Sequence, residues 1–415
     1  MNISASNYGR NNALRCKDWS GKDSFKKQLK KMIKNISLCI DELDTNIPYA
    51  VLEIKKSRVM KLKEMPLKVY AGTEALEHIQ SNGLKADDIS MLLGASSGPK
   101  WLILHGIDDF LINDFFKGRD KPLHLLGTSA GAWRMACYAM DRAELNGNEA
   151  HQRLTEAYVE QRYSAKPSGQ EVLNTCREII NTLLGEDGAH NIIQHPYMRM
   201  NLITTQCHGL TRANNKLIKG LGYGAAAILN AVHRKSLAWQ FTRLVMHHPQ
   251  EHFPSSTLND LPTRYAPLTE SNMSDAILST GAIPMIINGV NDVAGKGTYQ
   301  DGGITDYGFD LPLLPEDGFV LYPHFSKQPA PGWFDKRLTW RSPRHANYSK
   351  TIMLVPSDEF IAHLPQKKIP DRHDFLNLSD TDRIKSWRKT IELTQHLAQD
   401  LSIMDWPSRV EPLPW

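Results

Sequence analysis

From residue 67 onward, short apolar runs typical of buried strands alternate with stretches typical of helices. Residues 67–71 and 89–94 have the length and composition of strands, and residues 73–81 between them carry apolar side chains at helical spacing. Further strand-like runs occur at residues 201–205, 242–246, 318–322 and 351–355. This alternation predicts an α/β fold of three layers, α/β/α, in which helices cover a mostly parallel central sheet.

The first 65 residues differ from the rest of the chain. Residues 1–68 contain 15 Lys and Arg against 7 Asp and Glu, whereas the whole chain of 415 residues has a formal net charge of only +4. We therefore expect a basic N-terminal extension at 1–65, followed by one large domain at 66–415. Within the extension, residues 25–36 repeat apolar side chains on a basic background. This pattern predicts a solvated helix, with contact to an anionic membrane as the alternative.

Two regions of the large domain differ from the regular alternation. Residues from about 149 to 200 are predicted to form a helical insertion that can cover a site. Residues from about 330 to 415 are predicted to be a C-terminal extension. Apolar residues recur there at helical spacing from Ile384 to Met404, with Thr394 as the polar gap, and predict one terminal helix docked on the domain.

A further segment, residues 220–232, is uncharged and rich in small residues. We interpret it as a core helix. The alternative is a lid that lies on a bilayer, because the segment is too short to cross one.

The five cysteines are scattered without Cys-x-x-Cys spacing, which argues against a disulfide framework and against a zinc site. We expect no metal and no other cofactor.

No apolar run approaches the roughly 18 residues that a membrane span needs. We therefore expect a cytoplasmic protein, with peripheral membrane contact as an open alternative. We expect no nucleic-acid partner, and the sequence leaves the oligomeric state open.

A Gly-x-Ser-x-Gly motif from Gly127 to Gly131 is the strongest sign of chemistry in the chain. Residues 123–126 before it are typical of a buried strand, and residues 132–140 after it are typical of a helix. Glycine at both flanking positions lets the chain turn sharply enough to expose the hydroxyl group of Ser129. The motif predicts a nucleophilic serine, and an ordinary turn is the weaker alternative.

Two other small-residue segments offer what a nucleophilic serine requires. Residues 94–101 follow a buried strand and precede an apolar helix at 102–116, so their backbone N–H groups can face an anion at a helix N-terminus. A phosphate-binding P-loop is not matched, because Pro99 follows Gly98. Downstream, Asp301 stands directly before two glycines. By itself this triplet favours a turn in which Asp is a turn former.

The three motifs in this order resemble the patatin-like phospholipase family, over residues from about 67 to 310. The resemblance implies a patatin-like three-layer fold with helical insertions. It also implies that Ser129 is the nucleophile and Asp301 the general base, a catalytic dyad without histidine and without metal. The segment 275–284, with its small residues and final Pro, is similar to a helix of that family.

The oxyanion loop departs from the family pattern. The family usually has Gly-Gly-Gly-x-Arg-Gly, whereas residues 96–101 read Ser-Ser-Gly-Pro-Lys-Trp. The resemblance implies that Ser97 and Gly98 lie in the oxyanion loop, where backbone N–H groups bind the developing negative charge. Lys100 stands at the family's arginine, so it keeps the positive charge and loses the planar fork of a guanidinium group. The altered loop affects which substrate class we expect, but it does not affect the assignment of Ser129 as nucleophile or of Asp301 as base.

We therefore expect a serine acyl hydrolase that cleaves acyl esters of phospholipids or related lipids through an acyl-enzyme intermediate. A Ser-His-Asp triad is one alternative. The histidines that follow Asp301 and qualify by position are His324, His345, His363, His373 and His396. An acyltransferase or thioesterase is a second, although such relatives usually have His where Thr128 stands. A catalytically inactive lipid-binding or partner-binding module is the third.

Overall fold

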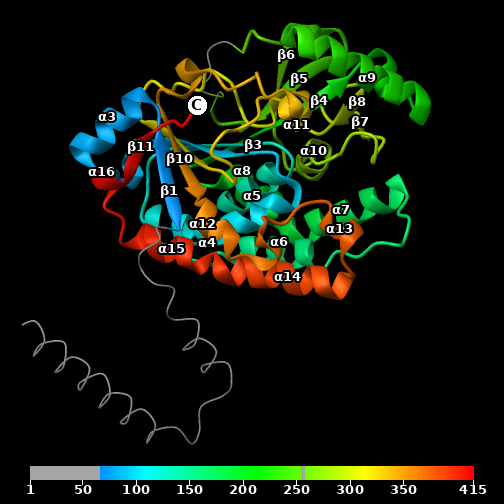
Figure 1. Cartoon of the computed structure of the whole chain (residues 1–415). Helices are drawn as coiled ribbons and strands as arrows, with labels where there is room; N and C mark the ends of the chain where they lie inside the picture. The colour runs from blue at the N-terminus through cyan, green and yellow to red at the C-terminus, as the bar shows by residue number, and fades with distance from the viewer. Residues whose placement is uncertain (1–65, 252, 254–257) are drawn as a thin grey trace, which may run out of the picture. The chain divides into compact units, whose positions relative to one another are not determined.

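The structure is a computed structural model that describes residues 66–251, 253 and 258–415. The predicted basic extension at 1–65, with its Lys-rich segment, lies outside the described residues. The strands of the described part form one sheet, which is flanked by helices (Figure 1). Most neighbouring strands in it are parallel. The predicted α/β fold with a mostly parallel central sheet is confirmed.

The sheet has the order β11-β1-β10-β9-β2-β3-β4-β5-β6. From β10 to β4 all neighbours are parallel, whereas β1 is antiparallel to β10, and β5 to β4. β8 pairs with both β4 and β7. The strands are Leu67–Ala71 (β1), Ile89–Gly94 (β2), Leu123–Gly127 (β3), Met198–Cys207 (β4), Phe241–His247 (β5), Thr263–Pro267 (β6), Val290–Asn291 (β7), Thr298–Gln300 (β8), Phe319–Pro323 (β9), Thr351–Pro356 (β10) and Val410–Pro412 (β11).

The helices connect these strands and cover the sheet. In the first half of the described chain they are Thr73–Asn82 (α3), His105–Phe110 (α4), Ala130–Tyr138 (α5), Glu149–Val159 (α6), Gly169–Leu184 (α7), Gly188–Gln194 (α8) and Lys216–Val232 (α9). In the second half they are Met273–Thr280 (α10), Gly303–Asp306 (α11), Asp358–Ala362 (α12), Asp374–Asn377 (α13), Asp380–Leu393 (α14), Gln395–Ser402 (α15) and Trp406–Arg409 (α16).

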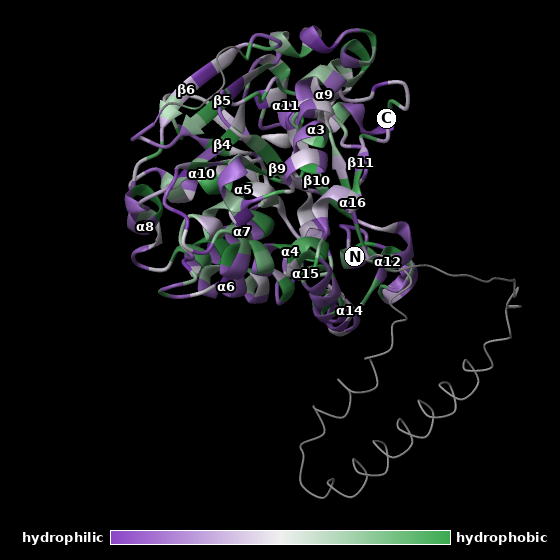
Figure 2. Ribbon diagram, turned by 90° about the vertical axis from the view of Figure 1, so that its left-hand side faces the viewer, coloured by the Kyte–Doolittle hydropathy of each residue, from purple (hydrophilic) through white to green (hydrophobic). Residues whose placement is uncertain are grey.

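Every segment predicted as a strand forms a strand of this sheet. β1 and β2 have the predicted bounds, and β4 extends the predicted 201–205 in both directions. β2 and β10 are mostly apolar because both faces of the sheet are covered there. All ten residues of β4 are buried as well. Figure 2 shows the hydrophobic strands in the interior and hydrophilic residues on outer helices such as α14. The carboxyl ends of β2 and β3 lie side by side, at the edge where α/β proteins bind ligands.

Helices α6, α7 and α8 occupy the place of the predicted insertion at about 149–200. The region from 330 to 415 supplies β10 and β11 to the sheet, and β10 lies between β1 and β9. Elements from both ends of the described chain therefore meet, as Figure 1 shows for α3, α16, β1 and β11. The division of the chain into extension, hydrolase domain and insertions stays a prediction.

The single terminal helix predicted between Ile384 and Met404 is wrong, because two helices, α14 and α15, meet there at Thr394. The Thr394 hydroxyl accepts a hydrogen bond from the Gly106 backbone N–H at 2.9 Å and donates one to the Ile391 carbonyl at 2.6 Å. The polar gap in the apolar stripe thus contacts α4, and the chain bends at this contact.

Helix α9 contains the small-residue segment 220–232, and only one of its faces belongs to the core. One face is buried, with Lys219, Tyr223 and Ala226. The opposite face exposes a stripe of large apolar side chains, Leu217, Leu221, Ile228 and Val232. Among the residues that the structure describes, no helix is long and apolar enough to cross a bilayer.

Candidate active site

Ser129 lies in the sharp turn between β3 and α5. Its backbone has φ 53° and ψ −135°, a conformation that residues other than glycine rarely adopt. Its backbone N–H donates a hydrogen bond to the hydroxyl of Thr280 at 2.9 Å, and the residue is 5% exposed. The strained turn directs the hydroxyl away from the sheet, as in the strand-turn-helix geometry that presents serine nucleophiles.

The two glycines beside Ser129 are required by close backbone contacts. A Cβ atom on Gly127 would lie 2.4 Å from the Cα atom of Ala132. A Cβ atom on Gly131 would lie 1.9 Å from the carbonyl oxygen of Gly94, at the end of the neighbouring strand. Neither contact is possible for a real side chain, so the turn can pack against β2 only with glycine at these positions.

Asp301 reaches Ser129 from a distant part of the sequence. It follows β8, and its carboxylate oxygen Oδ2 accepts a hydrogen bond from Ser129 Oγ at 2.9 Å. The other oxygen, Oδ1, accepts one from the Gly303 backbone N–H at 2.8 Å. Asp301 is 95% buried and its carboxylate is held in one orientation by these two bonds, with Oδ2 next to the proton of the Ser129 hydroxyl.

A chain of buried hydroxyl groups supports this pair from behind. Ser96 Oγ donates a hydrogen bond to Thr128 Oγ1 at 3.0 Å and lies 3.4 Å from Asp301 Oδ1. Thr128 Oγ1 in turn donates to the backbone carbonyl of Asp306 at 3.1 Å. Thr128, at the position where acyltransferase-type relatives usually have His, is thus part of the frame that joins the β2 loop, the serine turn and α11.

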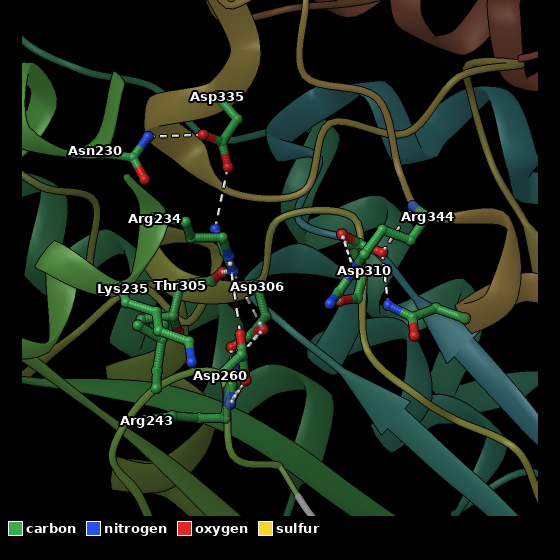
Figure 3. Close-up of polar contacts among 12 residues, drawn as sticks. Asn230, Arg234, Lys235, Arg243, Asp260, Thr305, Asp306, Asp310, Asp335 and Arg344 are labelled. Atoms are coloured by element: carbon green, nitrogen blue, oxygen red, sulfur yellow. Dashed lines mark hydrogen bonds and ion pairs between the residues drawn. The ribbon is translucent and has the colours of Figure 1, made fainter. Parts of the chain in front are cut away.

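Figure 3 shows a buried charge network that anchors the turn after Asp301. Asp306, at the end of α11, accepts two hydrogen bonds from the guanidinium group of Arg243 at 2.6 and 2.7 Å, and both side chains are fully buried. The same guanidinium group binds Asp260 at 2.8 and 3.1 Å. Arg234 adds contacts to the Thr305 carbonyl and to Asp335. The position of α11, and with it that of Asp301, rests on these ion pairs.

We expect Arg243→Met to lower the free energy of unfolding by about 3–5 kcal/mol, because it leaves the buried Asp306 carboxylate without its main partner. The measurement is urea unfolding followed by circular dichroism. Arg388→Met is the control, since Arg388 pairs with Glu156 on the surface and is about half exposed; its cost should stay below about 1 kcal/mol. Equal destabilisation by the two variants would contradict the anchoring role of Arg243.

Ser129 lines a cavity of about 350 Å³, in the size range of small-molecule and lipid sites. The cavity is walled mainly by apolar and aromatic side chains, among them Pro99, Trp133, Tyr158, Val172, Ile283 and Phe375. Helix α7 of the predicted insertion and helix α13 near the C-terminus supply parts of this wall. The cavity can hold an apolar chain beside the Ser129 hydroxyl.

The predicted oxyanion loop lies at the rim of the same cavity. Gly98 lines it together with Ser129 and has φ 54°, a left-handed conformation that favours glycine. Within the described chain, the backbone N–H groups of Ser97 and Gly98 have no hydrogen-bond partner. These N–H groups are therefore available to bind an anion.

Lys100 is not brought to Ser129. It lines a second cavity and not the one that contains Ser129, and its ammonium group lies 5.1 Å from the ring centre of Phe325. Burial lowers the pKa of Lys100, and so does the positive charge of Arg372. The position of Lys100 does not support the prediction that it belongs to the oxyanion hole. Gly98 lines the cavity of Ser129 and Ser97 the second cavity, and their oxyanion role stays a prediction.

None of the five candidate histidines hydrogen-bonds to Ser129 among the described residues. His324 is buried, and its Nδ1 contacts the backbone of Ser326. His363 Nδ1 contacts the Glu359 carbonyl. No histidine lines the cavity that contains Ser129. The side-chain partner of the Ser129 hydroxyl is Asp301.

Opposing effects act on the Asp301 carboxyl group. Burial is the largest, and it raises the pKa of Asp301 because the charged form loses hydration. The positive charge of Arg372, the Gly303 N–H and the Ser129 hydroxyl oppose this shift. The net result is a raised pKa, which makes the ionised carboxylate a stronger base than an ordinary aspartate.

Sequence reasoning did not single out Thr280 or Arg372. Thr280 lies in the small-residue segment at 275–284, which was noted as a whole, and its hydroxyl orients the Ser129 backbone. Arg372 comes from the chain before α13 and lines both cavities. No motif surrounds Arg372, so nothing in the sequence could have placed it beside the oxyanion loop.

Comparison with protein families gives one match that bears on this site. Residues 114–310 match the family model described as patatin-like phospholipase. Over these residues the chain is similar to a patatin-like phospholipase domain. The predicted resemblance is thus confirmed, and the match includes the serine turn and the Asp-Gly-Gly triplet but not residues 94–101. Proteins of this family are, in general, lipid acyl hydrolases.

Other comparisons add little to the patatin-like domain. No curated protein matches the chain. Among solved structures, the crystal structure of VipD from Legionella pneumophila is similar over 65% of this chain, with 14% sequence identity and a TM-score of 0.27. The chain spans 55% of the VipD chain.

Proposed function

We propose that the protein is a serine acyl hydrolase that cleaves acyl esters of phospholipids or related lipids, with Ser129 as nucleophile and Asp301 as general base. The observation that carries this proposal is the 2.9 Å hydrogen bond from Ser129 Oγ to Asp301 Oδ2, at the wall of an apolar cavity. A hydroxyl group becomes a nucleophile when a positioned base accepts its proton, and a buried carboxylate with a raised pKa is suited to that task.

The first half of the reaction forms the acyl-enzyme. Asp301 takes the proton of Ser129 while the serine oxygen attacks the ester carbonyl carbon. The backbone N–H groups of Ser97 and Gly98 stabilise the negative charge that develops on the carbonyl oxygen. The tetrahedral intermediate collapses, the C–O bond to the alcohol breaks, and the protonated Asp301 gives its proton to the departing oxygen.

The second half releases the fatty acid. Asp301, again ionised, takes a proton from a water molecule that attacks the acyl-enzyme carbonyl. The same N–H groups stabilise the second intermediate. The bond to Ser129 Oγ then breaks, and Asp301 returns the proton to the serine oxygen, which restores the starting state.

The apolar cavity suits the acyl chain. Its walls are nearly free of charge, with Arg372 as the exception among the lining residues. Burying an acyl chain gains about 0.8 kcal/mol per methylene group. An acyl chain held in this cavity has its carbonyl at the serine, which positions the reacting atoms.

The test is incubation of the purified protein with phospholipids, followed by mass spectrometry of the products. We expect free fatty acid and lysophospholipid to accumulate with the wild type and not with Ser129→Ala. Transfer of the acyl group to an added alcohol or thiol acceptor in preference to water would favour an acyltransferase. Failure of a fluorophosphonate probe to label Ser129 in folded protein would favour the inactive binding module.

The pH dependence of hydrolysis should report the base. Because the pKa of Asp301 is raised above its ordinary value of 3.8, we expect kcat/KM to fall, as the pH drops, at a pH higher than 3.8. The raised pKa also means that the folded protein binds this proton more readily than the unfolded chain, so protonation of Asp301 does not itself unfold the protein. Circular dichroism at each pH separates the two effects, and a flat profile down to pH 3.8 in folded protein would contradict the assignment.

A further inference from the structure

A second cavity, of about 710 Å³, also borders the predicted oxyanion loop. Ser97 lines it, while the next residue, Gly98, lines the acyl cavity, and Arg372 lines both. Four basic side chains line the second cavity, namely Lys100, Lys336, Arg337 and Arg372. The two cavities therefore share a wall that consists of the oxyanion loop and Arg372, and they differ sharply in charge.

The four basic side chains of this cavity form no direct ion pair in the described part of the chain. Within the described ranges, no carboxylate oxygen lies within 4.0 Å of the charged groups of these four side chains. One aspartate, Asp371, lines the cavity, but its carboxylate pairs with Lys368 at 3.1 Å and accepts the His373 backbone N–H at 2.7 Å. Asp371 acts on Lys100, and Asp301 on Lys336, from beyond ion-pair distance. The protein therefore offsets the positive charge of the cavity only in part.

The cavity also contains an unsatisfied polar group. Ser97 is 93% buried, and its hydroxyl has no hydrogen-bond partner among the described residues. A buried hydroxyl group without a partner costs free energy, so such groups commonly bind a ligand. The ammonium group of Lys336 lies 3.7 Å from the ring centre of Tyr307, and both residues line the cavity.

The cations of this cavity repel one another. Burial lowers the pKa of Lys336 most, and the positive charges of Arg372 and Lys100 lower it further. Burial and Arg372 have the same effect on the pKa of Lys100. An anion bound among these groups would relieve both the repulsion and the lack of hydrogen-bond acceptors.

We propose that this basic cavity binds the phosphate group of the substrate, so that the preferred substrates are phospholipids rather than neutral acylglycerols. The inference rests on the proposed function of Ser129 and Asp301. In a glycerophospholipid the ester oxygen, the glycerol carbons and the phosphoester oxygen are all that separate the ester carbonyl from the phosphorus atom. The acyl chain would fill the apolar cavity, the ester carbonyl would lie at the oxyanion loop, and the phosphate would bind Arg372, Lys336 and the Ser97 hydroxyl beyond it.

The test measures binding to protein that cannot turn over. Ser129→Ala protein is titrated with dihexanoyl phosphatidic acid and with dihexanoylglycerol, which has the same acyl chains and no phosphate. We expect phosphatidic acid to bind at least about tenfold more tightly. Lys336→Gln on this background should weaken phosphatidic acid binding about fivefold and leave dihexanoylglycerol binding within about twofold. Because no turnover is needed, the result does not depend on whether the hydrolysis experiment succeeds.

Lys296→Gln is the matched control, since Lys296 is an exposed lysine that lines neither cavity. It removes the same charge and should leave both affinities unchanged. Equal losses from Lys336→Gln and Lys296→Gln would overturn the proposal, and so would equal affinity for the two lipids. Inorganic phosphate separates the two sources of the anion: weak competition with phosphatidic acid supports a headgroup site. Phosphate binding that Lys336→Gln weakens, without any preference for phosphatidic acid over dihexanoylglycerol, would overturn the headgroup assignment in favour of free phosphate.

Discussion

Ser129→Ala is expected to lower the kcat of ester hydrolysis by at least about 10³-fold, because it removes the oxygen that forms the acyl-enzyme. The substitution deletes one atom in a residue whose hydroxyl donates to Asp301, so the backbone turn and the cavity should persist. The measurement is steady-state hydrolysis of a soluble short-chain ester, together with fluorophosphonate labelling of the intact protein.

Ser279→Ala serves as the control for this substitution. Ser279 is fully buried in α10, next to Thr280, and its hydroxyl donates only to the Ala276 carbonyl. Its removal alters the same packing layer without touching the reacting groups, so activity should stay within a few-fold of the wild type. Retained hydrolysis in Ser129→Ala, or equal losses in both variants, would remove Ser129 from the mechanism.

Asp301→Asn is expected to lower kcat/KM by about 10³- to 10⁴-fold. The amide has nearly the shape of the carboxylate, and its oxygen can still accept the hydrogen bond from Ser129 Oγ. It cannot take the proton, so the serine stays a weak nucleophile. The fall of kcat/KM at low pH that reports Asp301 should be absent from the residual activity of this variant. Fluorophosphonate labelling of Ser129 should slow as well.

The control for Asp301→Asn is Asp275→Asn. Asp275 begins the segment that leads to the active site, but its carboxylate is about half exposed and pairs with Arg177 at the surface. The same chemical change there should leave hydrolysis nearly unchanged. If Asp301→Asn keeps more than about a tenth of the wild-type kcat/KM, another group acts as the base.

The strands could be predicted where burial leaves a clear local signal. The segments that form β2 and β10 are short apolar runs, because strands in the parallel middle of the sheet are covered on both faces. β6, at the sheet edge, was not predicted, since most of its residues are exposed or half-buried and carry no apolar pattern. β8 has three residues, too few for any periodicity.

For the helices, the sequence predicts helical structure but not where a helix ends or which face it buries. The apolar stripe that ends at Met404 predicts helical structure, and helical structure is there. The break at Thr394 depends on the Gly106 N–H, which comes from the other end of the domain. Likewise, the composition of α9 predicts burial, but which of its faces packs against the sheet is decided by its neighbours.

By itself, the sequence singled out the residues of the proposed dyad, Ser129 and Asp301 with the glycines beside them, because a sharp turn and a small-residue contact impose strict local residue types. Only the tertiary structure decided that the two side chains meet at 2.9 Å, that Lys100 turns away, and that Arg372 stands between an apolar and a basic cavity. Charges and cavities arise from residues far apart in the chain. Their position is set by packing, which leaves no pattern in the local sequence.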